Sequence, residues 1–128
     1  MLRNVSRFMM STVNPNEMSI FKELTQWWHP NGPMQILYTY NYERVKFLRK
    51  FVQSENVIRP LNGQNILDVG CGAGFLAESM TRLGGNVIGL DPNPTSFHEA
   101  TAHQSSREDL KNLSYVNRSL EEYQEEKP

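Results

Sequence analysis

The sequence predicts an α/β fold in which three parallel strands are joined by crossover helices, with two further helices before the first strand. Two observations lead to this prediction. From residue 65 onward, short apolar segments alternate with segments of helical periodicity, in the order strand, helix, strand, helix, strand. The first of these strands ends in a glycine-rich turn that leads directly into a helix. Strands that alternate with helices pair in parallel through right-handed crossovers.

Length and composition limit what the chain can be. It has 128 residues, of which 38% are hydrophobic and 21% charged, a balance typical of one globular domain. Its net charge of −1 argues against binding to nucleic acid. A single cysteine, Cys71, excludes an intramolecular disulfide. No apolar segment approaches the roughly 20 residues of a membrane-spanning helix.

The first thirteen residues differ from the rest of the chain. They contain arginine, serine and apolar side chains but no acidic residue, and the first acid is Glu17. This composition is typical of a mitochondrial targeting segment, and a disordered tail is the alternative. We therefore expect residues 1–13 to lie outside the fold and residues 14–128 to form one incomplete domain.

Two helices are expected before the first strand. Asn14 can cap the first of them, with Pro15 at the first helical position. Its apolar residues recur at helical spacing and are Ile20, Phe21, Leu24, Trp27 and Trp28. The tryptophan pair packs in the core or forms the wall of a lid or substrate pocket. The second helix is expected from about Tyr42 to Ser54, with these side chains pointing inward: Val45, Leu48, Phe51 and Val52.

The remaining elements follow from local patterns of apolar residues and turn residues. In chain order they are a buried strand at 65–70, a helix at 75–83, a strand at 86–91, a helix from 95 to 105 or beyond, a strand at 113–117 and a solvated helix start at 121–126. Gly84 and Gly85 end the first of these helices, and Asp91-Pro92-Asn93-Pro94 forms a turn and cap before the second.

Binding chemistry is concentrated in the turn Asp68-Val69-Gly70-Cys71-Gly72-Ala73-Gly74. Alternating glycines bring bare backbone up to a ligand at the carboxyl end of a strand, and side chains at these positions would block that approach. Asp91 ends the second strand. An ionised carboxylate there can accept hydrogen bonds from both hydroxyls of a ribose. The glycine turn and this acid together predict a nucleoside site.

The spacing of the glycines indicates which nucleoside. A dinucleotide fingerprint counted from Gly70 needs glycine at position 75, where this chain has Phe75. A P-loop needs a Gly-Lys-Ser/Thr ending, which the turn lacks. The D-x-G-x-G-x-G spacing resembles motif I of the class I methyltransferases, which have a Rossmann-like fold. This resemblance implies S-adenosylmethionine as the cofactor.

A more specific resemblance extends over residues 11–123. It is to the ubiquinone-biosynthesis O-methyltransferases of bacteria and mitochondria, and it is carried by Ile66–Gly72, Leu76–Met80, Val87–Asp91, the Trp27-Trp28 pair and Asn41-Tyr42-Glu43-Arg44. It implies methylation of a catechol-type hydroxyl on a polyprenylated benzoate or quinol. It also implies a peripheral place on the matrix side of the mitochondrial inner membrane, among other quinone-pathway proteins. A methyltransferase for another small acceptor is the competing interpretation.

The resemblance also implies roles for single residues. Arg44 would meet the methionine carboxylate of the cofactor through two parallel hydrogen bonds, although as a residue of a basic helix it is otherwise a solvated charge. Asp68 would receive the amino group through water or anchor the turn. Ser119 follows the third strand, where this fold meets the adenine. The expected cofactor residues are Arg44, Asp68, Gly70, Gly72, Gly74, Asp91 and Ser119.

The chain departs from the family after the third strand. The family's sheet continues beyond that strand, and the element associated with a divalent cation, Mg²⁺, would follow. We therefore assign no catalytic base and no metal ligand in this chain. We expect a fragment, a spliced form or an incomplete gene model, inactive by itself, whose first strand is an open apolar edge. The alternative function is a truncated cofactor-binding or interaction module of the quinone-biosynthesis complex.

Overall fold

The computed structural model describes residues 13–22 and 24–126. Apart from Val13, the expected targeting segment or tail lies outside the described residues. The elements, in chain order, are α1 (Pro15–Lys22), α2 (Gln35–Val52), β1 (Asn65–Val69), α3 (Phe75–Arg82), β2 (Asn86–Leu90), α4 (Pro94–Gln104), the 3₁₀ turn η1 (Glu108–Leu110), β3 (Leu113–Val116) and α5 (Leu120–Glu126).

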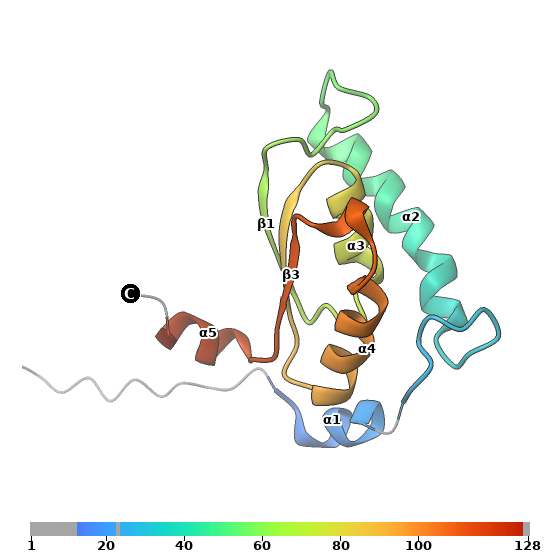
Figure 1. Cartoon of the computed structure of the whole chain (residues 1–128), viewed down its shortest axis with the longest axis vertical. Helices are drawn as coiled ribbons and strands as arrows, with labels where there is room; N and C mark the ends of the chain where they lie inside the picture. The colour runs from blue at the N-terminus through green and yellow to red at the C-terminus, as the bar shows by residue number, and fades with distance from the viewer. Residues whose placement is uncertain (1–12, 23, 127–128) are drawn as a thin grey trace, which may run out of the picture.

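The strands form one parallel sheet in the order β1-β2-β3. In the register, Val69 lies beside Leu90, and Leu90 lies beside Val116, so the carboxyl ends of the strands meet at one edge. Helices α3 and α4 lie along one side of the sheet, and α2 packs against α3 (Figure 1). The predicted fold class, three parallel strands with crossover helices after two N-terminal helices, is confirmed.

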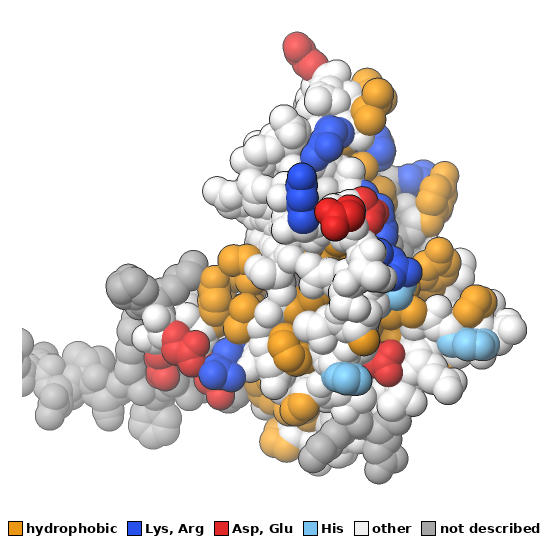
Figure 2. Space-filling view, viewed as in Figure 1, with side chains coloured by type: hydrophobic (Ala, Val, Ile, Leu, Met, Phe, Trp, Pro, Cys, Tyr) orange, Lys and Arg blue, Asp and Glu red, His pale blue; other side chains and the backbone are white. Residues whose placement is uncertain are grey.

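The core lies between the sheet and α3. Its buried side chains are Leu61, Ala77, Met80, Leu83, Val87, Leu110 and Leu113. Full burial of each large aliphatic side chain stabilises the fold by about 1.5–3 kcal/mol. Charged side chains of both signs lie beside one another over η1 and the adjoining part of α3, where Arg82 pairs with Asp109 (Figure 2).

The first helix is shorter than its apolar periodicity predicts. The Oδ1 atom of Asn14 accepts from the backbone N–H groups of Asn16 and Glu17, which confirms the predicted cap. The helix ends at Lys22, however, and Trp27 and Trp28 lie in a later turn. The prediction that they continue the helix is wrong, because both indoles pack against the glycine turn, contacts that a continuous helix would not make.

The second helix begins seven residues earlier than predicted, at Gln35 instead of Tyr42. Its C-cap, Gln53, has a left-handed backbone with φ 49°. Val45, Leu48 and Val52 pack against the core as predicted. Phe51 does not: its side chain is 75% exposed, and it stacks on Phe47 instead.

Strand β1 lies at an edge of the sheet, as expected. Its apolar residues Leu67 and Val69 are 40% and 52% exposed, so the strand is not buried on both faces as its composition predicts. A groove beside it is lined by Phe47, Leu48 and Leu67 among others. Within the described ranges, no helix is long and apolar enough to cross a membrane.

Candidate functional site

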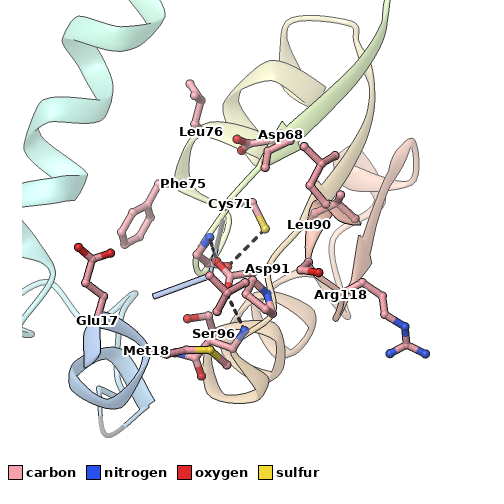
Figure 3. Close-up of a pocket in the computed structure, with 18 of the residues that line it drawn as sticks. Glu17, Met18, Asp68, Cys71, Phe75, Leu76, Leu90, Asp91, Ser96 and Arg118 are labelled. Atoms are coloured by element: carbon pink, nitrogen blue, oxygen red, sulfur yellow. Dashed lines mark hydrogen bonds between the residues drawn. The ribbon is translucent and has the colours of Figure 1, made fainter. Parts of the chain in front are cut away.

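A cavity of about 510 Å³ opens at the carboxyl ends of β1 and β2. This volume lies within the range of roughly 300–1,000 Å³ that small-molecule sites occupy. Six of the seven predicted cofactor residues line it, and these are Arg44, Asp68, Gly70, Gly72, Asp91 and Ser119. Asp68 and Asp91 reach it from neighbouring strands, and Glu17 reaches it from α1 (Figure 3). The parallel register explains this meeting of residues distant in sequence.

Asp91 connects the two strand ends through its carboxylate. Oδ2 accepts from the backbone N–H of Gly72 at 2.9 Å, and Oδ1 accepts from the backbone N–H of Asn93 at 2.9 Å. The carbonyl of Asp91 accepts from the side-chain amide of Asn117. Each carboxylate oxygen has two lone pairs, so both can accept a further hydrogen bond from a ligand hydroxyl. The carboxylate is therefore held in place by the backbone on both sides while it faces the cavity.

Asp68 carries a buried oxygen without a partner. Its Oδ2 makes no hydrogen bond in the structure. Burial raises the pKa of Asp68 to about 6, the nearby charge of Arg44 opposes this shift, and the charge of Asp91 adds to it. A buried acceptor that lacks a donor is unfavourable unless a ligand supplies the donor. Asp68 is thus suited to receive a cationic or N–H group in the cavity.

The raised pKa of Asp68 predicts a dependence of stability on pH. Since the folded pKa of about 6 exceeds the ordinary value of 3.8, the folded chain retains this proton more strongly than the unfolded chain between these values. The free energy of unfolding should therefore fall as pH rises through this window. Asp68→Asn removes the titrating group, so its urea midpoint relative to the unmodified chain should increase from pH 4 to pH 7.

The control for this titration is Asp109→Asn, because the side-chain hydrogen bond from Arg82 lowers the pKa of Asp109 instead of raising it. The measurement is the urea midpoint at four pH values of the unmodified chain, Asp68→Asn and Asp109→Asn. If the Asp68→Asn and unmodified curves run parallel from pH 4 to pH 7, folding does not raise the pKa of Asp68 and the prediction is wrong.

Gly74, the seventh predicted residue, has a different role. It does not line the cavity. A Cβ at Gly74, whose φ is +94°, would collide with the hydroxyl of Tyr115 on β3. Only glycine fits at this position, because the Tyr115 side chain of β3 packs against the start of α3 there. By contrast, a Cβ at Gly70 would meet nothing within 4 Å, so the open space that a ligand needs lies at the first glycine of the turn.

Ser119 lines the cavity, but its hydroxyl is used locally. Its Oγ accepts from the backbone N–H of Glu122, and the Glu122 carboxylate accepts from the backbone N–H of Ser119 at 2.8 Å. This reciprocal pair is a capping box at the start of α5. The neighbouring Arg118 also lines the cavity, although its guanidinium is directed outward and pairs with Glu126 at 2.9 Å (Figure 3). The Ser119 hydroxyl accepts the one hydrogen bond from Glu122, so its own O–H can still donate to an adenine nitrogen.

The N-terminal segment contributes residues that sequence reasoning did not assign. Glu17, Met18 and Trp27 all line the cavity. Asn41, the first residue of Asn-x-x-Arg, donates from its side-chain amide to the carbonyl of Phe75 and the hydroxyl of Ser79. It therefore fixes α2 on α3, one turn before Arg44. In the sequence, only its place in the Asn-x-x-Arg pattern pointed to a role for Asn41.

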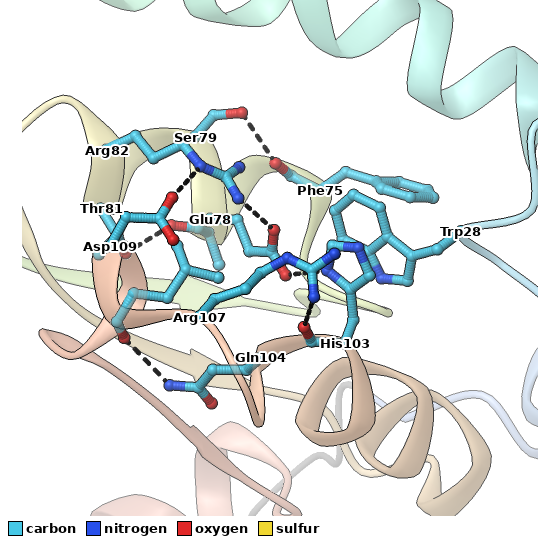
Figure 4. A network of polar contacts seen from close by, with 12 residues as sticks. Trp28, Phe75, Glu78, Ser79, Thr81, Arg82, His103, Gln104, Arg107 and Asp109 are labelled. Atoms are coloured by element: carbon cyan, nitrogen blue, oxygen red, sulfur yellow. Dashed lines mark hydrogen bonds and ion pairs between the residues drawn. The ribbon is translucent and has the colours of Figure 1, made fainter.

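A second polar cluster lies behind the cavity, between α3 and α4 (Figure 4). Glu78 is fully buried, with one oxygen 3.2 Å from Arg82 and the other 2.6 Å from Nδ1 of His103. Arg82 also pairs with Asp109 at 2.8 Å. The imidazole of His103 stacks on Trp28, with ring centroids 3.6 Å apart. This cluster ties α3, α4 and the tryptophan turn together.

Cys71 lies in the glycine turn but is poorly suited to act as a nucleophile. Burial raises the pKa of the Cys71 thiol above its ordinary value, which disfavours the nucleophilic thiolate. Its sulfur lies 3.5 Å from the carbonyl of Gly72. Among the described residues, no group of three histidine, cysteine or acidic side chains could hold a metal ion.

The chain is similar in sequence to known methyltransferases. Residues 66–128 match the family model described as a methyltransferase domain. The ubiquinone biosynthesis O-methyltransferase of Rhodopseudomonas palustris strain BisA53 is 42% identical over 99 residues, which cover 73% of this chain and 39% of that protein. The protein of the same name from strain BisB18 is 40% identical over 109 residues, covering 80% and 43%. The chain thus spans about two fifths of the length of these relatives.

Solved structures show the same fold. Magnesium protoporphyrin IX methyltransferase from Synechocystis PCC 6803, with bound SAM, aligns with a TM-score of 0.60 at 15% identity, over 87% of this chain and 58% of that one. The bifunctional kinase-methyltransferase WbdD aligns with a TM-score of 0.55 at 20% identity, over 86% and 25%. The fold is therefore Rossmann-like. With the sequence match, residues 66–128 belong to a methyltransferase domain of the class I type, and the chain is a homologue of the ubiquinone biosynthesis O-methyltransferases.

Proposed function

We propose that this chain is the cofactor-binding half of an O-methyltransferase of ubiquinone biosynthesis, which methylates a catechol-type hydroxyl of a polyprenylated benzoate or quinol. One observation carries the proposal: Asp68, Gly70 and Asp91 line one cavity at the carboxyl ends of adjacent parallel strands. The printed names of the relatives support the choice of pathway.

The residues of the cavity fit S-adenosylmethionine. The Asp91 carboxylate has free lone pairs for the ribose hydroxyls. The unpartnered Oδ2 of Asp68 suits the ammonium group, and the guanidinium of Arg44 suits the carboxylate of the methionine part. Gly70 leaves the backbone open to a close approach. When bound, this cofactor supplies an electrophilic methyl group, while these residues hold and orient it.

Neither a proton acceptor nor a metal ligand for the methyl transfer is assigned to this chain. The Mg²⁺ expected from the family finds no matching ligand cluster among residues 13–22 and 24–126. No step through a metal is therefore proposed here. The acceptor hydroxyl would have to be activated by groups other than those assigned to the cofactor.

The alternative function is a catalytically inactive cofactor-binding or interaction module of the quinone-biosynthesis complex. The exposed edge of β1, with Leu67 and Val69, favours it, because an apolar strand edge readily pairs with another chain. In either case the proposed location is the matrix side of the mitochondrial inner membrane, as a peripheral protein. The acid-free N-terminal composition supports this location, whereas the relatives named above are bacterial.

Calorimetric titration with S-adenosylhomocysteine tests the proposal, and NADH is the control ligand. The chain should bind S-adenosylhomocysteine with one site and should not bind NADH, because buried Phe75 stands where the dinucleotide fingerprint needs glycine. A methylation assay with a prenylated catechol then separates the two functions. Methyl transfer supports the enzyme, and binding without transfer supports the inactive module. Failure to bind S-adenosylhomocysteine contradicts both.

A further inference from the structure

The turn that holds Trp27 and Trp28 contacts the glycine turn directly. Trp27 is only 5% exposed, and it lines the cavity together with Gly72 and Asp91. It belongs to a segment that lies outside the strands and crossover helices. The residues of the cofactor motif therefore have a neighbour that comes from the N-terminal part of the chain.

The indole of Trp27 occupies the space beside Gly72. A Cβ built on Gly72 would lie 2.9 Å from Cζ3 and 3.2 Å from Cη2 of this ring. The ring is fixed in turn, because its Nε1 donates to the carbonyl of Leu24 at 3.0 Å and its face is tilted against Phe75. Gly72 is thus held between a fixed aromatic ring and the end of β2.

The next contact leads to the acid expected to bind ribose. The backbone N–H of Gly72 donates to Oδ2 of Asp91 at 2.9 Å. A shift of Gly72 would lengthen this hydrogen bond and leave the carboxylate held only by the backbone N–H of Asn93. The Trp27 ring thus lies against Gly72, and Gly72 in turn donates to the Asp91 carboxylate.

Trp28 anchors the same turn from the other side. Its Nε1 donates to the carbonyl of Ala73 at 3.0 Å. Its ring stacks on His103, with an interplanar angle of 2°, and meets Phe75 edge to face (Figure 4). Trp28 does not line the cavity, whereas Trp27 does. The two tryptophans therefore hold Gly72 and Ala73 from one short turn, and only Trp27 faces the ligand.

We propose that Trp27 is a positioning residue of the cofactor site, which holds Gly72 so that its N–H keeps the Asp91 carboxylate oriented toward the ribose. This inference rests on the proposed function, since it concerns the same cavity. It adds the N-terminal turn to the site as a part that sets affinity. A side chain that only filled the core would affect stability without affecting the order of the glycine turn.

Hydrogen exchange and calorimetry on the full chain test this role. In the ligand-free protein, Trp27→Ala should speed amide exchange at Gly72 and Asn93, the two N–H groups that bind Asp91. It should raise the Kd for S-adenosylhomocysteine by about tenfold, because the order lost from the site must be regained on binding. Trp27→Phe should restore most of the affinity. Ile58→Ala, at an 81% exposed position outside the cavity, is the control.

A double-variant comparison isolates the contact. Gly72→Ala strains the backbone in any background, because φ is +57°. Its collision with the indole occurs only when Trp27 is present. Gly72→Ala should therefore raise the Kd by a larger factor in the Trp27 chain than in the Trp27→Ala chain. Equal factors, or unchanged exchange at Gly72 in Trp27→Ala, overturn the inference. Absence of S-adenosylhomocysteine binding by the unmodified chain instead overturns the proposed function, and with it this role.

Discussion

Asp91→Ala should raise the Kd for S-adenosylhomocysteine by roughly 30-fold to 150-fold, the factor that corresponds to about 2–3 kcal/mol of lost charge-assisted hydrogen bonding. Two effects contribute. The variant removes the acceptors for both ribose hydroxyls, and it removes the acceptors of the Gly72 and Asn93 N–H groups that order the site. The measurement is a calorimetric titration of each variant under one buffer condition.

Two controls make the result specific. Asp91→Asn keeps the shape and one acceptor oxygen but loses the charge, so its Kd should fall between those of Asp91→Ala and the unmodified chain. Asp109→Asn changes an exposed acid away from the cavity and should leave the Kd unchanged. Far-ultraviolet circular dichroism verifies that each variant is folded. If a folded Asp91→Ala binds as tightly as the unmodified chain, the cofactor assignment is wrong.

Glu78→Gln should lower the free energy of unfolding by roughly 3 kcal/mol, since breaking a buried ion pair leaves groups without their charged partner. The Glu78 carboxylate is fully buried and contacts both Arg82 and His103. A neutral amide of the same size cannot serve as a charged acceptor for both. A small domain has a total stability of only about 5–15 kcal/mol, so the loss should be large enough to measure in urea.

The matched control is the other ion pair of the same arginine. Asp109→Asn removes the partner of Arg82 on the exposed side, where water can replace it, and its urea midpoint should stay near that of the unmodified chain. If the two variants shift the urea midpoint equally, the burial of Glu78 does not explain how much it contributes to the free energy of unfolding. Because His103 stacks on Trp28, Glu78→Gln should also change tryptophan fluorescence in the folded state.

Much of the fold could be predicted because the relevant signals are local. The β1 strand, the helix after it and β2 were placed within a residue or two of their observed bounds, since apolar periodicity and glycine turns mark them. The start of α2 was missed, because aromatic and β-branched residues such as Ile36 and Tyr38 have modest helix propensity. The burial of β1 was overestimated, because apolar composition shows that a strand is suited to burial but not whether other elements cover it.

The candidate site divides in the same way. That Asp68, Gly70 and Asp91 lie around one cavity could be predicted from sequence, because parallel pairing brings the carboxyl ends of adjacent strands together. Their role in binding the cofactor stays a prediction. Gly74 was assigned with them, but it does not line the cavity, and a Cβ there would collide with Tyr115. Glu78 was not singled out, because a glutamate inside a helix resembles a solvated one until its neighbours are known.

The sequence by itself determined the α/β alternation and the resemblance to methyltransferases, and it predicted that the glycine turn and Asp91 lie together at one edge of the sheet. These properties depend on residue types and spacings within single elements and on one general rule of strand pairing. Only the tertiary structure decided that Trp27 packs on Gly72, that Trp28 binds Ala73 from 45 residues away, and that His103 meets Glu78 across 25 residues. The physical reason is that such contacts depend on which surfaces meet after the chain has folded, and local patterns do not encode that.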